Sequence, residues 1–280
     1  MQQRKAEDSQ FPVFISAAFF LVAPILVLMF MARKDRTAQL RTPGEHYQTA
    51  VRDTTQPDSA HVSRSLATVS FGQKVTVVTW TREKSIPDYQ RQNAPGYKDT
   101  WVTIAPNLKS FCQDYVKSHG ADSKQLTQRL EQRLGLPLNS GNDWFIELSV
   151  TPKNISEFFR PCNNPDPTSN TCQVALPCWA QDAKSNTCLP RTPALLKEDL
   201  SDPKKKQELE SRYWSLNNYY GSFASPKQYP WTFLGYTFDW ATNEAGDDLV
   251  RFGESEFVIP AGAPIHYVSD TDTVTYCTPK

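Results

Sequence analysis

The stretch TWVTIAPNLKSFCQDYVKSHG, residues 100–120, decides how the chain is expected to fold. Its first part, TWVTIA (100–105), has the short, β-branched and aromatic character of a strand. In residues 107–118 the apolar side chains recur at helical spacing, which places Cys112 on the buried face, and Gly120 ends the helix. A strand followed directly by a helix with a buried cysteine points to a mixed α+β domain.

The rest of the chain after Leu66 reads as further short strands and helices. The expected strands are 66–71 and 74–81, joined by a turn at Gly72–Gln73, then 144–150, 231–240, 255–260, 264–270 and 273–277. The expected helices are 123–134 and one that starts at Asp202, while 84–98 reads as a loop. This order predicts one α+β domain, 66–280, with a mainly antiparallel sheet.

Two nearly identical loops, bracketed by cysteines, follow one another within a Cys-rich insertion at 160–193. They read PCNNPDPTSNTC at 161–172 and PCWAQDAKSNTC at 177–188, and they agree at seven of twelve positions. The chain has six cysteines: Cys112, Cys162, Cys172, Cys178, Cys188 and Cys277. An even number of cysteines at regular spacing favours disulfides over free thiols.

The repeat predicts that each loop closes on itself, through Cys162–Cys172 and Cys178–Cys188. An alternative pairing links the two loops to each other. A Cys112–Cys277 bond would join the two ends of the domain and so favours one domain over two. The gaps between cysteines are not those of structural zinc sites, and each loop offers a single Asp, so we expect no metal.

Residues 11–32, FPVFISAAFFLVAPILVLMFMA, carry no charge. A helix of this length spans about 33 Å, enough for a hydrocarbon core of about 30 Å. Cleavage after Ala32 would place Phe30 where a signal peptidase needs a small residue. We therefore expect an N-terminal, uncleaved, single transmembrane helix that contacts the lipid bilayer, preceded by a short tail (1–10).

Two features of the sequence predict opposite orientations for this span. Arg33, Lys34, Arg36 and Arg41 follow the span and favour a cytoplasmic C-terminal part. Disulfides, however, rarely persist in the cytosol, and long domains cross membranes largely regardless of flanking charge. We therefore expect a cytoplasmic tail, a polar linker over 33–65, and a domain in the periplasm or outside the cell.

The composition excludes some functions and leaves two open. Lys+Arg and Asp+Glu both number 30, and this balance argues against nucleic-acid binding. No catalytic constellation or cofactor motif is evident. The first hypothesis is therefore a single-pass accessory or interaction protein of the cytoplasmic (inner) membrane, with a protein partner in the envelope.

The alternative hypothesis is a carbohydrate- or peptidoglycan-binding module, or a hydrolase, in the envelope. Aromatic rings stack on sugars, and paired carboxylates can catalyse glycoside hydrolysis. The candidate residues are Trp231, Tyr236, Asp239, Glu254 and Glu256. Against this hypothesis, both faces of the expected strand 231–240 are largely apolar, as in a core strand.

Overall fold

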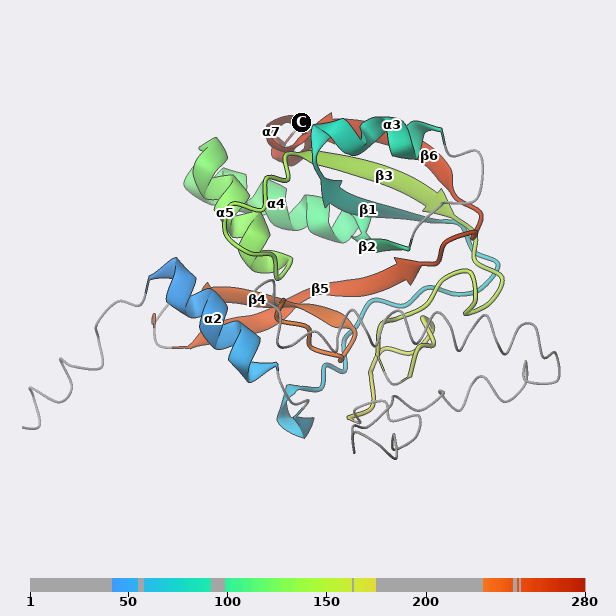
Figure 1. The fold of residues 1–280 in the computed structure, drawn as a ribbon, viewed down its shortest axis with the longest axis horizontal. Coiled ribbons are helices and arrows are strands. Elements are labelled where there is room, and N and C mark those ends of the chain that lie inside the picture. The colour runs from blue at the N-terminus through green and yellow to red at the C-terminus, as the bar shows by residue number, and fades with distance from the viewer. Residues whose placement is uncertain are drawn as a thin grey trace, which may run out of the picture. The chain divides into compact units, whose positions relative to one another are not determined.

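Short runs rich in β-branched and aromatic residues form an antiparallel sheet (Figure 1). The computed structural model describes residues 42–54, 58–91, 99–162, 164–174, 229–243, 246 and 248–279. Within these ranges the strands are β1 (Val75–Thr81), β2 (Thr100–Ile104), β3 (Trp144–Val150), β4 (Tyr236–Thr242), β5 (Leu249–Ile259) and β6 (His266–Asp272). They form one six-stranded sheet in the order β4-β5-β2-β1-β3-β6. The predicted α+β class with a mainly antiparallel sheet is confirmed.

The register of the central strands places three distant residues side by side. Val78 of β1 lies opposite Thr103 of β2, and Thr103 in turn lies opposite Glu256 of β5. Because directly opposed residues in antiparallel strands share a face, these side chains lie on the same side of the sheet. This row positions the candidate site described below.

Two amphipathic helices cover that same side of the sheet. Helix α4 (Ala105–His119) lies against β1 and β2, and helix α5 (Ser123–Arg133) lies beside α4 and against β4 (Figure 1). Their inner residues are buried against Val78, Trp80 and Phe145 of the sheet: Leu108, Cys112, Leu126 and Leu130. Both predicted helices and the buried position of Cys112 are therefore confirmed.

The opposite side of the sheet is buried by loops and a short helix rather than by long helices. Its core consists of aliphatic and aromatic residues, among them six from β1, β2, β3 and β5: Val77, Val102, Ile146, Leu148, Phe257 and Ile259. The 3₁₀ turn η2 (Glu83–Ser85) and helix α3 (Ile86–Gln90) lie at the β6 edge. The prediction of a loop over 84–98 is therefore wrong for 86–90, where Pro87 starts a helix that buries Tyr89.

A helix, α2 (Pro43–Asp53), lies inside the predicted linker 33–65, so that prediction is wrong for these residues. Thr42 and Glu45 form a reciprocal capping box, in which each side chain accepts a hydrogen bond from the other residue's backbone N–H. One face of α2 packs against Phe238 and Trp240 and carries Tyr47, Ala50 and Val51. A single 3₁₀ turn, η1 (Ser59–His61), follows in the described part of this region.

The predicted strand 66–71 is also wrong, although the turn before β1 forms. Gln73 N–H donates to the carbonyl of Ser70, as a tight turn requires. The backbone before the turn pairs instead with the first cysteine loop, where Leu66 N–H donates to Asn170 O and Val69 N–H donates to Pro167 O. The stapled loop thus takes the place of a partner strand.

The last predicted strand, 273–277, is a short helix, α7 (Thr273–Cys277). The Asp272 side chain accepts a hydrogen bond from Thr275 N–H at 3.0 Å and so caps this helix. Cys277 then reaches Cys112 on α4. The alternating, β-branched sequence TVTYC therefore folds as a helix because a cap and a covalent bond fix both of its ends.

Two of the three predicted disulfides lie in the described residues, and both are formed. Cys112–Cys277 links residues 165 apart, and Cys162–Cys172 closes the first loop on itself. The second loop, with Cys178 and Cys188, lies outside the described residues, as do the expected helix after Asp202 and residues 1–41. Among the residues that are described, no helix has the length and apolar character needed to cross a bilayer.

The first cysteine loop is held in place by a buried arginine as well as by its disulfide. Arg160 is fully buried, and its guanidinium donates to the carbonyl oxygens of Gly235, Ala67 and Ser169. The same group lies 4.5 Å from the centre of the Phe257 ring. Burial lowers the pKa of Arg160 to about 10, so the side chain remains a cation at neutral pH. One charged side chain thus ties the loop to two other segments.

Candidate functional site

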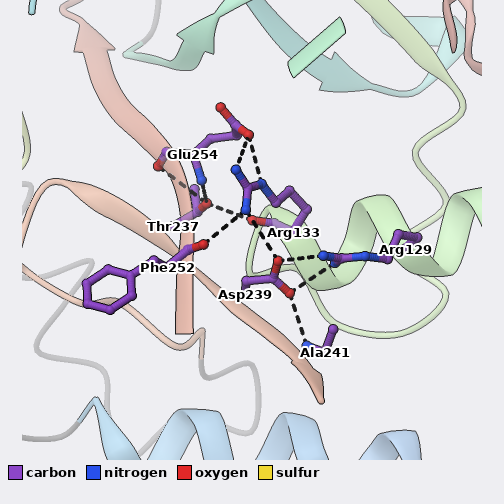
Figure 2. Close-up of polar contacts among 7 residues, drawn as sticks. All are labelled: Arg129, Arg133, Thr237, Asp239, Ala241, Phe252 and Glu254. Carbon is purple, nitrogen blue, oxygen red and sulfur yellow. Dashed lines mark hydrogen bonds and ion pairs between the residues drawn. The ribbon is translucent and has the colours of Figure 1, made fainter. Parts of the chain in front are cut away.

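A buried cluster of charged residues joins α5 to β4 and β5 (Figure 2). Arg129 binds both carboxylate oxygens of Asp239, at 3.0 and 2.7 Å. Arg133 binds Glu254 at 2.7 Å and lies 3.6 Å from Asp239. Asp239 is fully buried and also accepts a hydrogen bond from the Ala241 N–H at 3.1 Å.

This charged cluster is part of the scaffold. Both carboxylates are buried, and each is already neutralised by a guanidinium group. The end of α5 is also fixed by Thr237, whose hydroxyl donates to Arg133 O at 2.8 Å and accepts from Glu254 N–H at 2.8 Å. Gly253 lies where these segments meet, and a Cβ at that position would overlap the carbonyl oxygens of Thr237 and Arg133. The cluster therefore holds the helix close to the sheet.

A cavity of about 210 Å³ opens beside this cluster, on the side of the sheet that carries α4 and α5. Its floor is the sheet, with Thr103 of β2 and Glu256 of β5. One wall is the segment that leaves α5, Leu134–Leu136, and another is the segment 229–231. Three tryptophans contribute to the lining: Trp80 of β1, Trp101 of β2 and Trp231 of the 229–231 wall. The cavity is therefore mostly apolar, with one carboxyl group in it.

Glu256 differs sharply from Glu254, which lies two residues earlier on the same face of β5. Glu254 is bound by Arg133, whereas no described residue forms a hydrogen bond or ion pair with the Glu256 side chain. Burial without a compensating cation raises the pKa of Glu256 to about 8. A carboxyl group of this kind, in a cavity, is a candidate binding or proton-transfer residue.

Thr103 adds a second polar group without a partner. Its side chain is 5% exposed, and its hydroxyl has no hydrogen bond in the part of the chain that the structure describes. Unsatisfied buried hydroxyls are uncommon in folded proteins because they lose their hydrogen bonds to water. Thr103 lines the cavity directly opposite Glu256. A ligand that occupies the cavity would meet both groups.

The aromatic wall is formed by rings that contact one another. The Trp101 and Trp231 ring centres are 4.5 Å apart, and Tyr229 lies 5.7 Å from Trp231 at its edge. Trp101 comes from β2, whereas Tyr229 and Trp231 precede β4 by only a few residues. This packing fixes the position of the rings before any ligand binds.

The five residues of the carbohydrate hypothesis therefore fall into two groups. Trp231, Tyr236 and Glu256 line the cavity. Asp239 and Glu254 belong to the charged cluster. Tyr236 is almost fully buried, and its hydroxyl donates to the carbonyl oxygen of His61 at 2.8 Å.

Sequence reasoning missed Trp101 and Thr103, because they lie about 150 residues from Glu256 in the chain. The alternation within TWVTIA places these two side chains on one face of a strand, and this was the only local signal. Their closeness to Glu256 depends on the pairing of β2 with β5, which no short motif encodes.

The described residues contain no group of three or more His, Cys, Asp or Glu side chains arranged to hold a metal ion. Comparison with protein-family models, with curated proteins and with solved structures finds no match for this chain. Its function is therefore argued from its own residues.

Proposed function

We propose that this protein is an accessory protein of the cell envelope that is anchored by residues 11–32 and acts outside the cytoplasm by binding. Its binding site for a small ligand is the cavity beside Glu256. The observation that carries the proposal is the contrast between the two glutamates of β5: Glu254 has a guanidinium partner, and Glu256 faces an aromatic cavity without one.

The shape and lining of the cavity support binding. Small-molecule sites are typically concave and largely apolar, with a few polar groups that fix the ligand's orientation. This cavity offers a wall of packed aromatic rings and two polar groups that lack partners, Glu256 and Thr103. A ligand could supply the hydrogen bond that the buried Thr103 hydroxyl lacks and a partner for the half-buried carboxyl group of Glu256.

The geometry lends no support to glycoside hydrolysis. That reaction needs two carboxyl groups on either side of the bond to be cleaved. Only Glu256, of the three candidate carboxyl groups, lines the cavity. Asp239 and Glu254 bind Arg129 and Arg133, and moving either carboxylate would leave a half-buried arginine without its partner.

The disulfides support an extracytoplasmic location, because such bonds persist in oxidising compartments. A direct test is to treat intact cells with a thiol-alkylating reagent and to analyse the cysteines by mass spectrometry. We expect Cys112, Cys162, Cys172 and Cys277 to remain unmodified until a reductant is added. Rapid alkylation of all four in unreduced, denatured protein would contradict the proposed location.

Equilibrium dialysis of the full-length protein against an envelope extract tests the binding function. Retained compounds are identified by mass spectrometry, first for the wild-type protein and then for Thr103→Leu, which partly fills the cavity. Thr271→Leu on β6 is a matched substitution outside the cavity lining. We expect a retained compound that is lost with Thr103→Leu and kept with Thr271→Leu. Equal retention by all three proteins, or no retention by any, would contradict the proposal.

A further inference from the structure

We propose that the ligand of this cavity is an organic ammonium ion, with its cation against Glu256 and its apolar part against Trp101 and Trp231. This inference rests on the proposed function and names the class of ligand. It follows from the charge of the lining, from its limited supply of polar groups and from its aromatic wall.

The charge of the lining favours a cation. Glu256 is the one acidic side chain among the described residues that line the cavity, and that lining includes no Lys, Arg or His. The nearby guanidinium groups of Arg129 and Arg133 are held by Asp239 and Glu254. An anionic ligand would find no positive partner in this lining, whereas a cationic ligand would supply the positive partner that the Glu256 carboxylate lacks.

The hydrogen-bonding groups of the lining argue against a ligand rich in hydroxyl groups. Three are already used within the protein: Tyr236 donates to His61 O, Thr237 donates to Arg133 O, and the Trp80 indole N–H donates to the Thr273 hydroxyl. A sugar would bury several hydroxyl groups against these occupied partners, at about 1–3 kcal/mol for each unsatisfied group. An ammonium group needs only a few acceptors, and Glu256 and Thr103 provide them.

The aromatic wall suits both parts of such a ligand. A cation is attracted to the face of a tryptophan ring, by about 0.5–2 kcal/mol depending on how far it is removed from water. The apolar part of the ligand would pack against the Trp101 and Trp231 rings, which contact each other at 4.5 Å. A volume of about 210 Å³ fits a small amine.

Binding of an ammonium ion should be linked to the ionisation of Glu256. Burial raises the pKa of this carboxyl to about 8, so in the empty cavity it is mostly protonated at pH 7. The other titratable side chains of the lining are Tyr229 and Tyr236, and burial raises the pKa of Tyr236 to about 12. The neighbouring ion pair on β5 is that of Glu254 with Arg133. A bound cation favours the carboxylate, so Glu256 should release close to one proton per ligand at pH 7.

Isothermal titration of the full-length protein with benzylamine tests this inference. Benzyl alcohol is the neutral analogue of nearly equal size, and glucose represents a ligand rich in hydroxyl groups. Titrations in two buffers of different ionisation enthalpy measure the protons released. We expect benzylamine to bind at least tenfold more tightly than either neutral compound. Its Kd should fall about tenfold per pH unit up to about pH 8.

Glu256→Gln is the matched variant, since it keeps the shape of the side chain and removes its charge. We expect it to weaken benzylamine binding at least tenfold and to abolish both the proton release and the pH dependence. Equal binding of benzylamine and benzyl alcohol, or binding unchanged by Glu256→Gln, would overturn the ammonium inference. The ammonium inference would also fail if the wild-type protein did not bind benzylamine but did retain a compound from the extract that Thr103→Leu loses. In that case the proposed binding function of the cavity would stand.

Discussion

Replacing Glu256 with glutamine should change how the stability of the protein depends on pH. Burial raises the pKa of Glu256 from 4.5 to about 8. Between these two pH values the folded protein holds a proton that the unfolded chain has released, so the free energy of unfolding falls as pH rises. In Glu256→Gln this contribution is absent, because the amide does not ionise.

The magnitude follows from the size of this shift. A pKa that moves from 4.5 to about 8 corresponds to about 5 kcal/mol, at about 1.36 kcal/mol for each pH unit. The cavity admits water, which stabilises the carboxylate, so we expect a smaller loss of about 1–3 kcal/mol between pH 5 and pH 8. Glu256→Gln should match the wild-type protein near pH 5 and be more stable than it at pH 8 by this amount.

Urea unfolding of the full-length protein, followed by tryptophan fluorescence at pH 5, 6, 7 and 8, measures the difference. Glu83→Gln removes an exposed carboxylate outside the cavity lining and serves as the control, which should keep the wild-type difference between pH 5 and pH 8. If the free energy of unfolding depends on pH in the same way in the wild-type protein and in Glu256→Gln, Glu256 does not carry a raised pKa. The reasoning about the cavity then fails.

Three further variants, and one control in α2, test the scaffold of the domain by chemical or thermal unfolding. Gly253→Ala should destabilise the protein by about 3 kcal/mol, because a Cβ overlaps two backbone oxygens, whereas Gly44→Ala in α2 should leave stability equal or raise it by up to about 1 kcal/mol. Replacing both Cys112 and Cys277 with alanine opens a loop of 165 residues and should lower stability by about 5 kcal/mol; no change in Tm would contradict this estimate. Arg129→Met keeps the contact with the Phe111 ring but leaves the buried Asp239 without its closest partner. We expect the free energy of unfolding to fall by about 2–4 kcal/mol, and an unchanged unfolding midpoint would refute this expectation.

The fold was most predictable where local signals and packing agree. In 107–118 and 123–134, apolar residues at helical spacing meet a buried sheet, and the helices form as expected. In 273–277 the signals conflict, because a β-branched sequence is overruled by an N-cap and a disulfide. Helix α2 was missed although its first residues, Thr42 to Glu45, carry a capping-box signature and a proline at the first helical position.

The candidate site was predictable only in part, for a different reason. Trp231 and Glu256 could be singled out as an aromatic residue and a carboxylate on neighbouring predicted strands. The different roles of Glu254 and Glu256 could not be predicted, because the cation that neutralises Glu254 comes from α5, more than a hundred residues away. The same long-range pairing that supplies Arg133 to one glutamate leaves the next one without a partner.

The bond between Cys112 and Cys277 also has a mechanical consequence. It closes residues 112 to 277 into a covalent ring that holds α5, four strands and one part of the cavity lining, including Glu256 and Trp231. A pulling force applied across the domain from its N-terminal side would extend the residues before the ring, by about 3.5 Å each, and then stop. Glu256 would thus lie in the part of the molecule that the bond protects from extension, whereas β1 and β2 lie outside the ring and would give way first. Because β2 carries Trp101 and Thr103, tension would open the cavity by removing these two residues from Glu256.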